Sequence, residues 1–127
     1  MKRSILFLLA LFSVTMTIQA AYYYRGDKNS WGTGIQLTQS ADGYYYYYEA
    51  TAGAHNFKIL NSATSWSATQ WNENNILSLY NGTDVAVTKA GSDQNIKCSA
   101  TTKHYILFYP KNTKLNGSTN DYICAST

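Results

Sequence analysis

The sequence lacks the local motifs by which many enzymes are recognised. It contains no GxSxG nucleophile elbow, no HExxH helix and no glycine-rich phosphate loop. The two histidines, His55 and His104, have no neighbouring nucleophile motif. The seven acidic residues fall mostly in expected turns, whereas a glycosidase holds two carboxyl groups about 5 to 10 Å apart across a cleft. We therefore expect a protein that is not an enzyme and needs no cofactor and no metal.

The chain also lacks a concentrated positive charge. Its formal net charge is +3, from ten Lys and Arg against seven Asp and Glu. Without Lys2 and Arg3, which begin an expected leader, eight basic side chains face seven acidic ones. The remaining lysines are scattered along the sequence. Neither nucleic acid nor an anionic membrane surface is therefore an expected partner.

Cysteine is scarce, since Cys98 and Cys124 are the only two. No CxxC or HxxxH pattern accompanies them, so a zinc site is a poor interpretation. Two cysteines in an oxidising compartment usually pair. We expect a Cys98–Cys124 disulfide between two late strands; the alternative is two free or metal-bound thiols.

The N-terminal apolar run is too short to span a bilayer. Residues 1–20 instead have the pattern of an export signal: Lys2 and Arg3 come first, Ile5 to Val14 is apolar apart from one serine, and Ala20 ends a small-residue cleavage site. This predicts a secreted, periplasmic or cell-surface protein; the alternative is a retained membrane anchor. Residues 21–127, the 107 that remain, suit one domain.

No long helical periodicity follows the leader. Short alternating or aromatic segments recur, with Gly, Asn, Asp and Ser between them, and this spacing is typical of an all-β sandwich. The expected strands are 21–25, 34–37, 44–49, 55–60, 76–80, 84–89, 95–99, 103–109 and 121–125. The sequons that begin at Asn81 and Asn116 carry glycans in a eukaryotic host and otherwise are expected to be ordinary turns.

Alternation within the strands predicts which side chains point inward. In the tyrosine run from Tyr44 to Tyr48, odd and even positions face opposite sides of the sheet, so one set packs in the core and the other lies outside. In the segment 55–60, Phe57 and Ile59 point inward and Lys58 points outward. The segment 103–109 is apolar on both faces, which predicts a central strand.

All three tryptophans, Trp31, Trp66 and Trp71, lie among polar, mostly uncharged residues. An indole face covers the C–H face of a pyranose, and neutral polar side chains satisfy the sugar hydroxyls. The composition therefore favours a neutral polyhydroxylated ligand. The competing interpretation is that each tryptophan packs in the core of a sandwich.

One region resembles the starch-binding carbohydrate-binding modules, the immunoglobulin-like sandwiches found on amylases, glucoamylases and pullulanases. Gly26-Asp27-Lys28-Asn29-Ser30-Trp31 is similar to their opening, Phe57-Lys58-Ile59 to a later strand, and Trp66 to a second tryptophan. Ser67 and the run Asn72-Glu73-Asn74-Asn75 depart from the family pattern, which often has an acidic residue and an Asn-Arg pair there.

The resemblance implies a single immunoglobulin-like antiparallel sandwich that binds α-glucan, with Trp31 and Trp66 stacking on sugar rings and Lys58 bonding to a hydroxyl. Trp71 and Asn72 are the next candidates for sugar contact. A separate glycoside hydrolase or a cell-surface protein is the implied partner. The alternative function is protein recognition by a secreted sandwich, such as an adhesin or envelope component, because surface tyrosines also serve protein interfaces.

Overall fold

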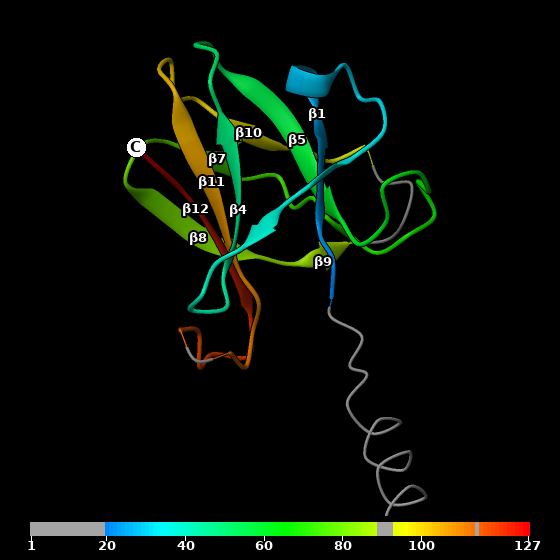
Figure 1. Cartoon of the computed structure of the whole chain (residues 1–127), viewed down its shortest axis with the longest axis vertical. Coiled ribbons are helices and arrows are strands. Elements are labelled where there is room, and N and C mark those ends of the chain that lie inside the picture. The colour runs from blue at the N-terminus through cyan, green and yellow to red at the C-terminus, as the bar shows by residue number, and fades with distance from the viewer. Residues whose placement is uncertain (1–19, 89–92, 114) are drawn as a thin grey trace, which may run out of the picture.

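Two β-sheets packed face to face form the part of the chain that the computed structural model describes, residues 20–88, 93–113 and 115–127 (Figure 1). Sheet A contains β1 (Tyr23–Gly26), β2 (Ile35–Gln36), β5 (His55–Leu60), β6 (Gln70–Trp71), β7 (Ile76–Leu77), β9 (Val87–Thr88) and β10 (Ile96–Cys98). Sheet B contains β3 (Thr38–Gln39), β4 (Tyr45–Glu49), β8 (Asn81–Val85), β11 (His104–Tyr109) and β12 (Asp121–Ser126). The prediction of an all-β sandwich is confirmed.

Strand order explains how the sequence builds the two layers. Sheet A runs β2-β1-β5-β10-β7, with β6 and β9 attached beside β5, and sheet B runs β3-β4-β11-β12-β8. All pairs are antiparallel except β10 with β7. β11 lies between β4 and β12, so the prediction of a central strand there is confirmed.

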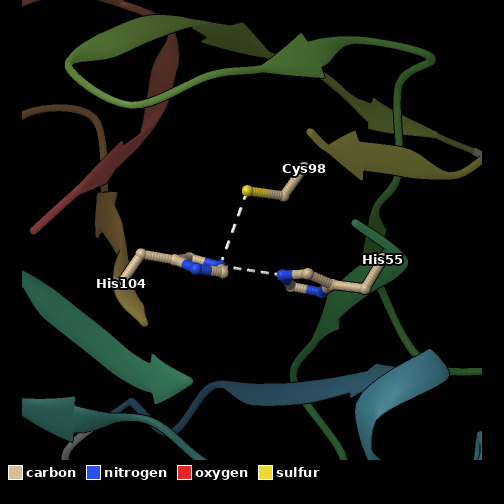
Figure 2. Close-up of side chains that lie close together, drawn as sticks. All are labelled: His55, Cys98 and His104. Atoms are coloured by element: carbon tan, nitrogen blue, oxygen red, sulfur yellow. Dashed lines mark hydrogen bonds between the residues drawn. The ribbon is translucent and has the colours of Figure 1, made fainter. Parts of the chain in front are cut away.

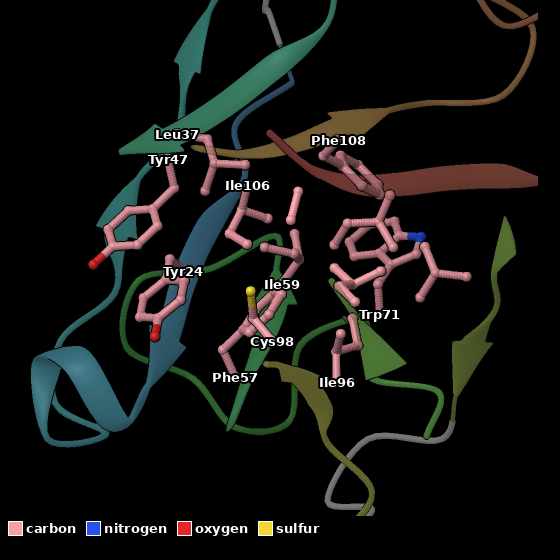
Figure 3. Packing of buried hydrophobic residues seen from close by; sticks show 14 of the residues in the cluster. Tyr24, Leu37, Tyr47, Phe57, Ile59, Trp71, Ile96, Cys98, Ile106 and Phe108 are labelled. Atoms are coloured by element: carbon pink, nitrogen blue, oxygen red, sulfur yellow. The ribbon is translucent and has the colours of Figure 1, made fainter. Parts of the chain in front are cut away.

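The core lies between the inner faces of the two sheets (Figure 3). Phe57 and Ile59 of β5 are fully buried, as their alternation predicts. Tyr45 and Tyr47 point into the core from β4, whereas Tyr48 is 45% exposed on the outer face of sheet B. The tyrosine run therefore serves both faces of one strand.

Aromatic contacts join the two layers across the core. Tyr24 of β1 stacks on Tyr47 of β4 with ring centroids 4.0 Å apart and planes 11° apart. Tyr22 contacts the edges of Tyr45, Phe108 and Trp71 at centroid distances of 4.6 to 5.4 Å. Such pairs stabilise a fold by about 0.5 to 1.5 kcal/mol each beyond the burial of their area.

The expected Cys98–Cys124 disulfide is not formed, and both cysteines are free thiols. Cys98 points into the core from sheet A and is fully buried. Cys124 lies in sheet B between the buried residues Ile123 and Ala125, so its side chain points away from the core. The two thiols are therefore on different sides of sheet B, and no rotation of their side chains brings them together.

Several remaining expectations concern the chain ends and the sequons. Residues 1–19, with nearly all of the expected export signal, lie outside the described residues. Among the residues that are described, no helix is long and apolar enough to cross a membrane. Asn81 begins strand β8 rather than standing in a turn. Asn116 forms an isolated antiparallel bridge with Thr113, and its side-chain nitrogen donates to the carbonyls of Tyr109 and Asn120 at 2.9 Å each.

Candidate functional site

Two cations lie side by side on the outer face of sheet A. Arg25 of β1 and Lys58 of β5 are register partners, and the neighbouring side chains Tyr24 and Ile59 point the other way, into the core. Both cations are nonetheless buried, at 5% and 7% exposure. Burial lowers the pKa of each group, because desolvation penalises its charged form. Another part of the chain must therefore shield these two side chains from solvent on the outer face of sheet A.

The cover is the indole of Trp66. The Arg25 guanidinium carbon lies 3.6 Å from the centroid of the Trp66 ring, and Lys58 Nζ lies 5.7 Å from it. A cation against an aromatic face is attracted by the ring quadrupole, by about 0.5 to 2 kcal/mol. Trp66 keeps 38% of its surface exposed. One face of the indole therefore rests on the protein while part of the side chain remains open to solvent.

Trp31 reaches the same place from the connection between β1 and β2. Ser30 and Trp31 both have a left-handed backbone, with φ of 55° and 57°, which is unfavourable for residues other than glycine. The Trp31 amide donates to the Gly26 carbonyl at 2.9 Å, and its indole Nε1 donates to Asp27 Oδ1 at 2.9 Å. These bonds hold the side chain in one orientation.

Arg25 also fixes the same connection. Its Nε donates to the Gly32 carbonyl at 2.6 Å, and its Nη2 donates to the Trp31 carbonyl at 3.1 Å. One guanidinium therefore contacts the Trp66 ring with its face and holds the Trp31 segment with its edge. Since arginine presents several donors in a rigid plane, it can serve both roles at once.

The segment that carries Trp66, residues 61–69, is anchored to sheet A through Gln70. The Gln70 side-chain nitrogen donates to the Trp66 carbonyl at 2.6 Å. Its Oε1 accepts from Asn72 Nδ2 at 3.1 Å and from Lys58 Nζ at 3.4 Å. A further bond, from the Gly34 amide to the Ala63 carbonyl at 2.7 Å, joins the two tryptophan-bearing segments.

Together these contacts bring Trp31 and Trp66 into a pair, which we call the tryptophan pair. Their ring centroids are 6.2 Å apart and their planes are inclined by 38°. Both side chains are at least partly accessible. The exposed residues next to them, Thr33, Ser65 and Ser67, carry hydroxyl groups. The pair is thus an accessible aromatic surface with neutral polar neighbours and buried cations beneath it.

The other predicted sugar contacts are not part of that surface. Trp71 is 8% exposed in the core, and its Nε1 donates to Asp121 Oδ2 at 2.7 Å. Asn72 is fully buried and supports Gln70. Lys58 points outward as predicted, but it is covered by Trp66 and is not presented to a ligand. These three residues are covered because strand β6 turns Trp71 inward and residues 61–69 lie over the outer face of β5.

Sequence reasoning missed the residues that position the pair: Arg25, Asp27 and Gln70. Asp27 accepts from Trp31 with one oxygen, and its other oxygen accepts from the Asn56 amide at 2.8 Å. Their bonds to the tryptophan segments are local, but each residue also contacts a group far away in the sequence, which no local pattern identifies. These distant partners are Trp66 for Arg25, Asn56 for Asp27 and Lys58 for Gln70. The register between β1 and β5 is what places Arg25 beside Lys58.

A second accessible aromatic surface lies on the outer face of sheet B. Four tyrosine rings form a chain of contacts there, with centroid distances of 4.8 to 6.4 Å between successive rings. In order, the rings are Tyr44, Tyr46, Tyr105 and Tyr48. Leu107 and Ser126 complete a shallow pocket with three of these tyrosines, of about 390 Å³. We call this surface the tyrosine face.

Comparisons with protein-family models, with curated proteins and with solved structures find no match for this chain.

Proposed function

We propose that this protein is an exported, non-catalytic carbohydrate-binding module, and that its ligand is an α-glucan such as starch or glycogen. The observation that carries the proposal is the tryptophan pair, two accessible indoles of which Trp66 rests on buried cations and Trp31 is held by Asp27. The resemblance of Gly26–Trp31, Phe57–Ile59 and Trp66 to starch-binding modules supports the same ligand.

The inclination of the pair favours a curved glucan chain. Each indole can cover the C–H face of one sugar ring and exclude water from it. A flat β-linked chain such as cellulose presents its rings nearly in one plane and is best matched by coplanar indoles. An α-linked chain turns between successive sugars, which suits two rings 6.2 Å apart with planes 38° apart.

The polar surroundings favour a neutral ligand held weakly. The cations of the site, Arg25 and Lys58, are buried beneath Trp66 and directed at protein groups. The exposed hydroxyls of Thr33, Ser65 and Ser67 can donate to and accept from sugar hydroxyls. A small exposed contact of this kind gives modest affinity, with Kd of roughly 1 µM to 1 mM.

Retention on insoluble starch tests this function. The purified protein is mixed with starch granules or with cellulose, and the bound fraction is measured for wild type, Trp66→Ala and Tyr48→Ala. Tyr48→Ala is the matched control, because it removes an exposed aromatic residue from the opposite sheet. We expect wild type and Tyr48→Ala to bind starch alone and Trp66→Ala to stay in solution. Wild type remaining in solution would refute the α-glucan assignment.

The second candidate function is protein recognition, and the tyrosine face favours it. Tyrosine is enriched at protein interfaces because its ring is apolar and its hydroxyl still bonds. A sandwich that recognises protein through this face would not be retained on starch, and its tryptophan fluorescence would not respond to glucan. If the tyrosine face instead bound starch, Tyr48→Ala would lose retention and Trp66→Ala would keep it.

A further inference from the structure

A cluster of two histidines and a cysteine lies at one end of the core, separate from the tryptophan pair. His55 is the first residue of β5, Cys98 the last of β10 and His104 the first of β11. The three side chains are buried, at 2%, 0% and 0% exposure, and they point toward one another (Figure 2). Since His55 and Cys98 are register partners in sheet A and His104 belongs to sheet B, the cluster bridges the two sheets.

Three potential ligand atoms converge in this cluster. The Nε2 atoms of His55 and His104 are 2.9 Å apart, and Cys98 Sγ is 3.5 Å from His104 Nε2. All three atoms lie within 4.8 Å of one another. In a trigonal site with metal–nitrogen bonds of about 2.0 Å, the two nitrogens lie about 3.5 Å apart. If the two rings moved apart by roughly another half an ångström, an ion would therefore fit between the nitrogens.

The second ring nitrogen of each histidine is held by an outer partner. His104 Nδ1 lies 2.6 Å from the Thr102 carbonyl, which can only accept, so this nitrogen carries the proton and Nε2 presents its lone pair to the cluster. His55 Nδ1 lies 2.7 Å from the Tyr24 hydroxyl. Metal-binding histidines are typically oriented by such partners.

Metal binding would rearrange the protons of the cluster. Because His104 Nε2 is an acceptor, His55 Nε2 donates across the 2.9 Å contact between them. For His55 Nε2 to bind a metal, its proton would move to Nδ1, where the Tyr24 hydroxyl can accept it. Binding would form one metal–sulfur and two metal–nitrogen bonds and would release the thiol proton to solvent.

We propose that His55, Cys98 and His104 form a copper site, with Cu(I) as the form that binds most tightly. Two imidazoles and a thiolate are a donor set that copper accepts in trigonal geometry, whereas structural zinc is almost always four-coordinate. Within the described residues, no fourth His, Cys, Asp or Glu joins the cluster. Cu(I) with one thiolate is neutral, while Zn²⁺ would leave one positive charge in the core, which is costly.

The cluster lies beneath the connection from β10 to β11. This connection is exposed at Ser99, Thr101, Thr102 and Lys103. The Thr102 carbonyl that orients His104 belongs to it. Entry of an ion by this route would require a local movement of the connection.

Copper binding is measured by titrating the purified, reduced protein with Cu(I) in competition with a chromogenic chelator. The variants are Cys98→Ser and the matched control Cys124→Ser, which removes the other thiol from the outer face of sheet B. We expect one ion per chain in wild type and in Cys124→Ser. In Cys98→Ser we expect the affinity for Cu(I) to fall by more than about 100-fold. Such a loss exceeds the one that follows when a group that only orients a metal ligand is removed. Binding that survives in Cys98→Ser, or that vanishes in Cys124→Ser, would overturn the assignment.

X-ray absorption of the copper-loaded wild type keeps the test decisive if Cys98→Ser does not fold. The expected spectrum has one sulfur and two imidazole nitrogens around copper. A spectrum without sulfur contradicts the proposal, as does the absence of any binding, which would leave the cluster as a buried hydrogen-bond chain. A parallel titration with Zn²⁺ addresses the choice of metal: zinc displacing Cu(I) from the cluster would overturn the copper assignment.

Discussion

At the scale of single residues, the three tryptophans have different roles although the sequence gives them similar neighbours. Trp31 and Trp66 are accessible and in contact, whereas Trp71 is in the core beside Tyr22 and Phe108. What distinguishes Trp71 is its strand. β6 pairs with β5 so that Trp71 lies opposite Ile59, and it therefore shares the inward direction of that residue.

Trp71→Phe is predicted to lower stability without affecting sugar binding. The change removes the buried bond to Asp121 and part of a large side chain, so we expect the free energy of unfolding to fall by about 2 to 4 kcal/mol. Urea unfolding measures this loss, and starch retention of the folded variant should equal that of wild type. Weakened retention with unchanged stability would return Trp71 to the binding surface.

Arg25 is predicted to be a positioning residue for the tryptophan pair. Arg25→Lys keeps the charge but loses the planar contact with Trp66 and the bonds to the carbonyls of Gly32 and Trp31. We expect glucan affinity to fall by about tenfold, the equivalent of 1.4 kcal/mol. The near-ultraviolet circular dichroism of the coupled indoles should fall as well.

The control for this change is Lys97→Ala, an exposed cation on β10 of the same sheet. It should leave both affinity and the dichroism signal at the wild-type level. If Arg25→Lys behaved as this control does, the guanidinium would have no role in holding the pair.

At the scale of elements, the connection between β1 and β2 stores strain that orients Trp31. Two consecutive residues with positive φ cost about 1 to 2 kcal/mol each relative to ordinary conformations. The bonds from Arg25, Asp27 and the Gly26 carbonyl offset this cost. A fixed indole loses little entropy when a ligand binds, which favours affinity.

Ser30→Gly is predicted to stabilise the protein, because glycine adopts a φ of 55° without steric cost. The gain in unfolding free energy should be about 0.5 to 1 kcal/mol, since glycine also gains freedom in the unfolded chain. Chemical denaturation of Ser30→Gly and Ser30→Ala provides the comparison. A glycine variant less stable than the alanine variant would contradict the account of strain in this connection.

Alternation and turn residues suffice to predict the principal strands but not their neighbours. The segments 44–49, 55–60 and 103–109 match β4, β5 and β11 closely, since each is long and rich in aromatic and aliphatic residues. The two-residue strands β3 and β6 were missed, because so short a segment carries no period of its own. For the candidate site, composition and resemblance indicate Trp31 and Trp66. The place of Arg25 could not be predicted, because it depends on the pairing of β1 with β5 and on contact with the distant Trp66.

At the scale of the whole molecule, the sandwich is held by its core and not by a cross-link. Both thiols are free, and they lie on opposite sides of sheet B. Stability must therefore come from the buried aromatic and aliphatic residues between the sheets.

A reducing agent is predicted to leave the thermal midpoint unchanged. A disulfide closing this loop would contribute about 3 kcal/mol, so its reduction would lower Tm by about 10 °C or more. Scanning calorimetry with and without reductant measures the difference. Mass spectrometry after alkylation of the unfolded, unreduced protein should find two modified cysteines, and finding none would establish the disulfide.

Binding of α-glucan by the tryptophan pair is measured by a fluorescence titration. Tryptophan emission is followed while a malto-oligosaccharide or, separately, a cello-oligosaccharide is added to wild type and to Trp71→Phe. We expect a saturable change with malto-oligosaccharide only, with Kd of roughly 1 µM to 1 mM, and the same change in Trp71→Phe. No response to malto-oligosaccharide in wild type, or a response that disappears in folded Trp71→Phe, would contradict glucan binding by the pair.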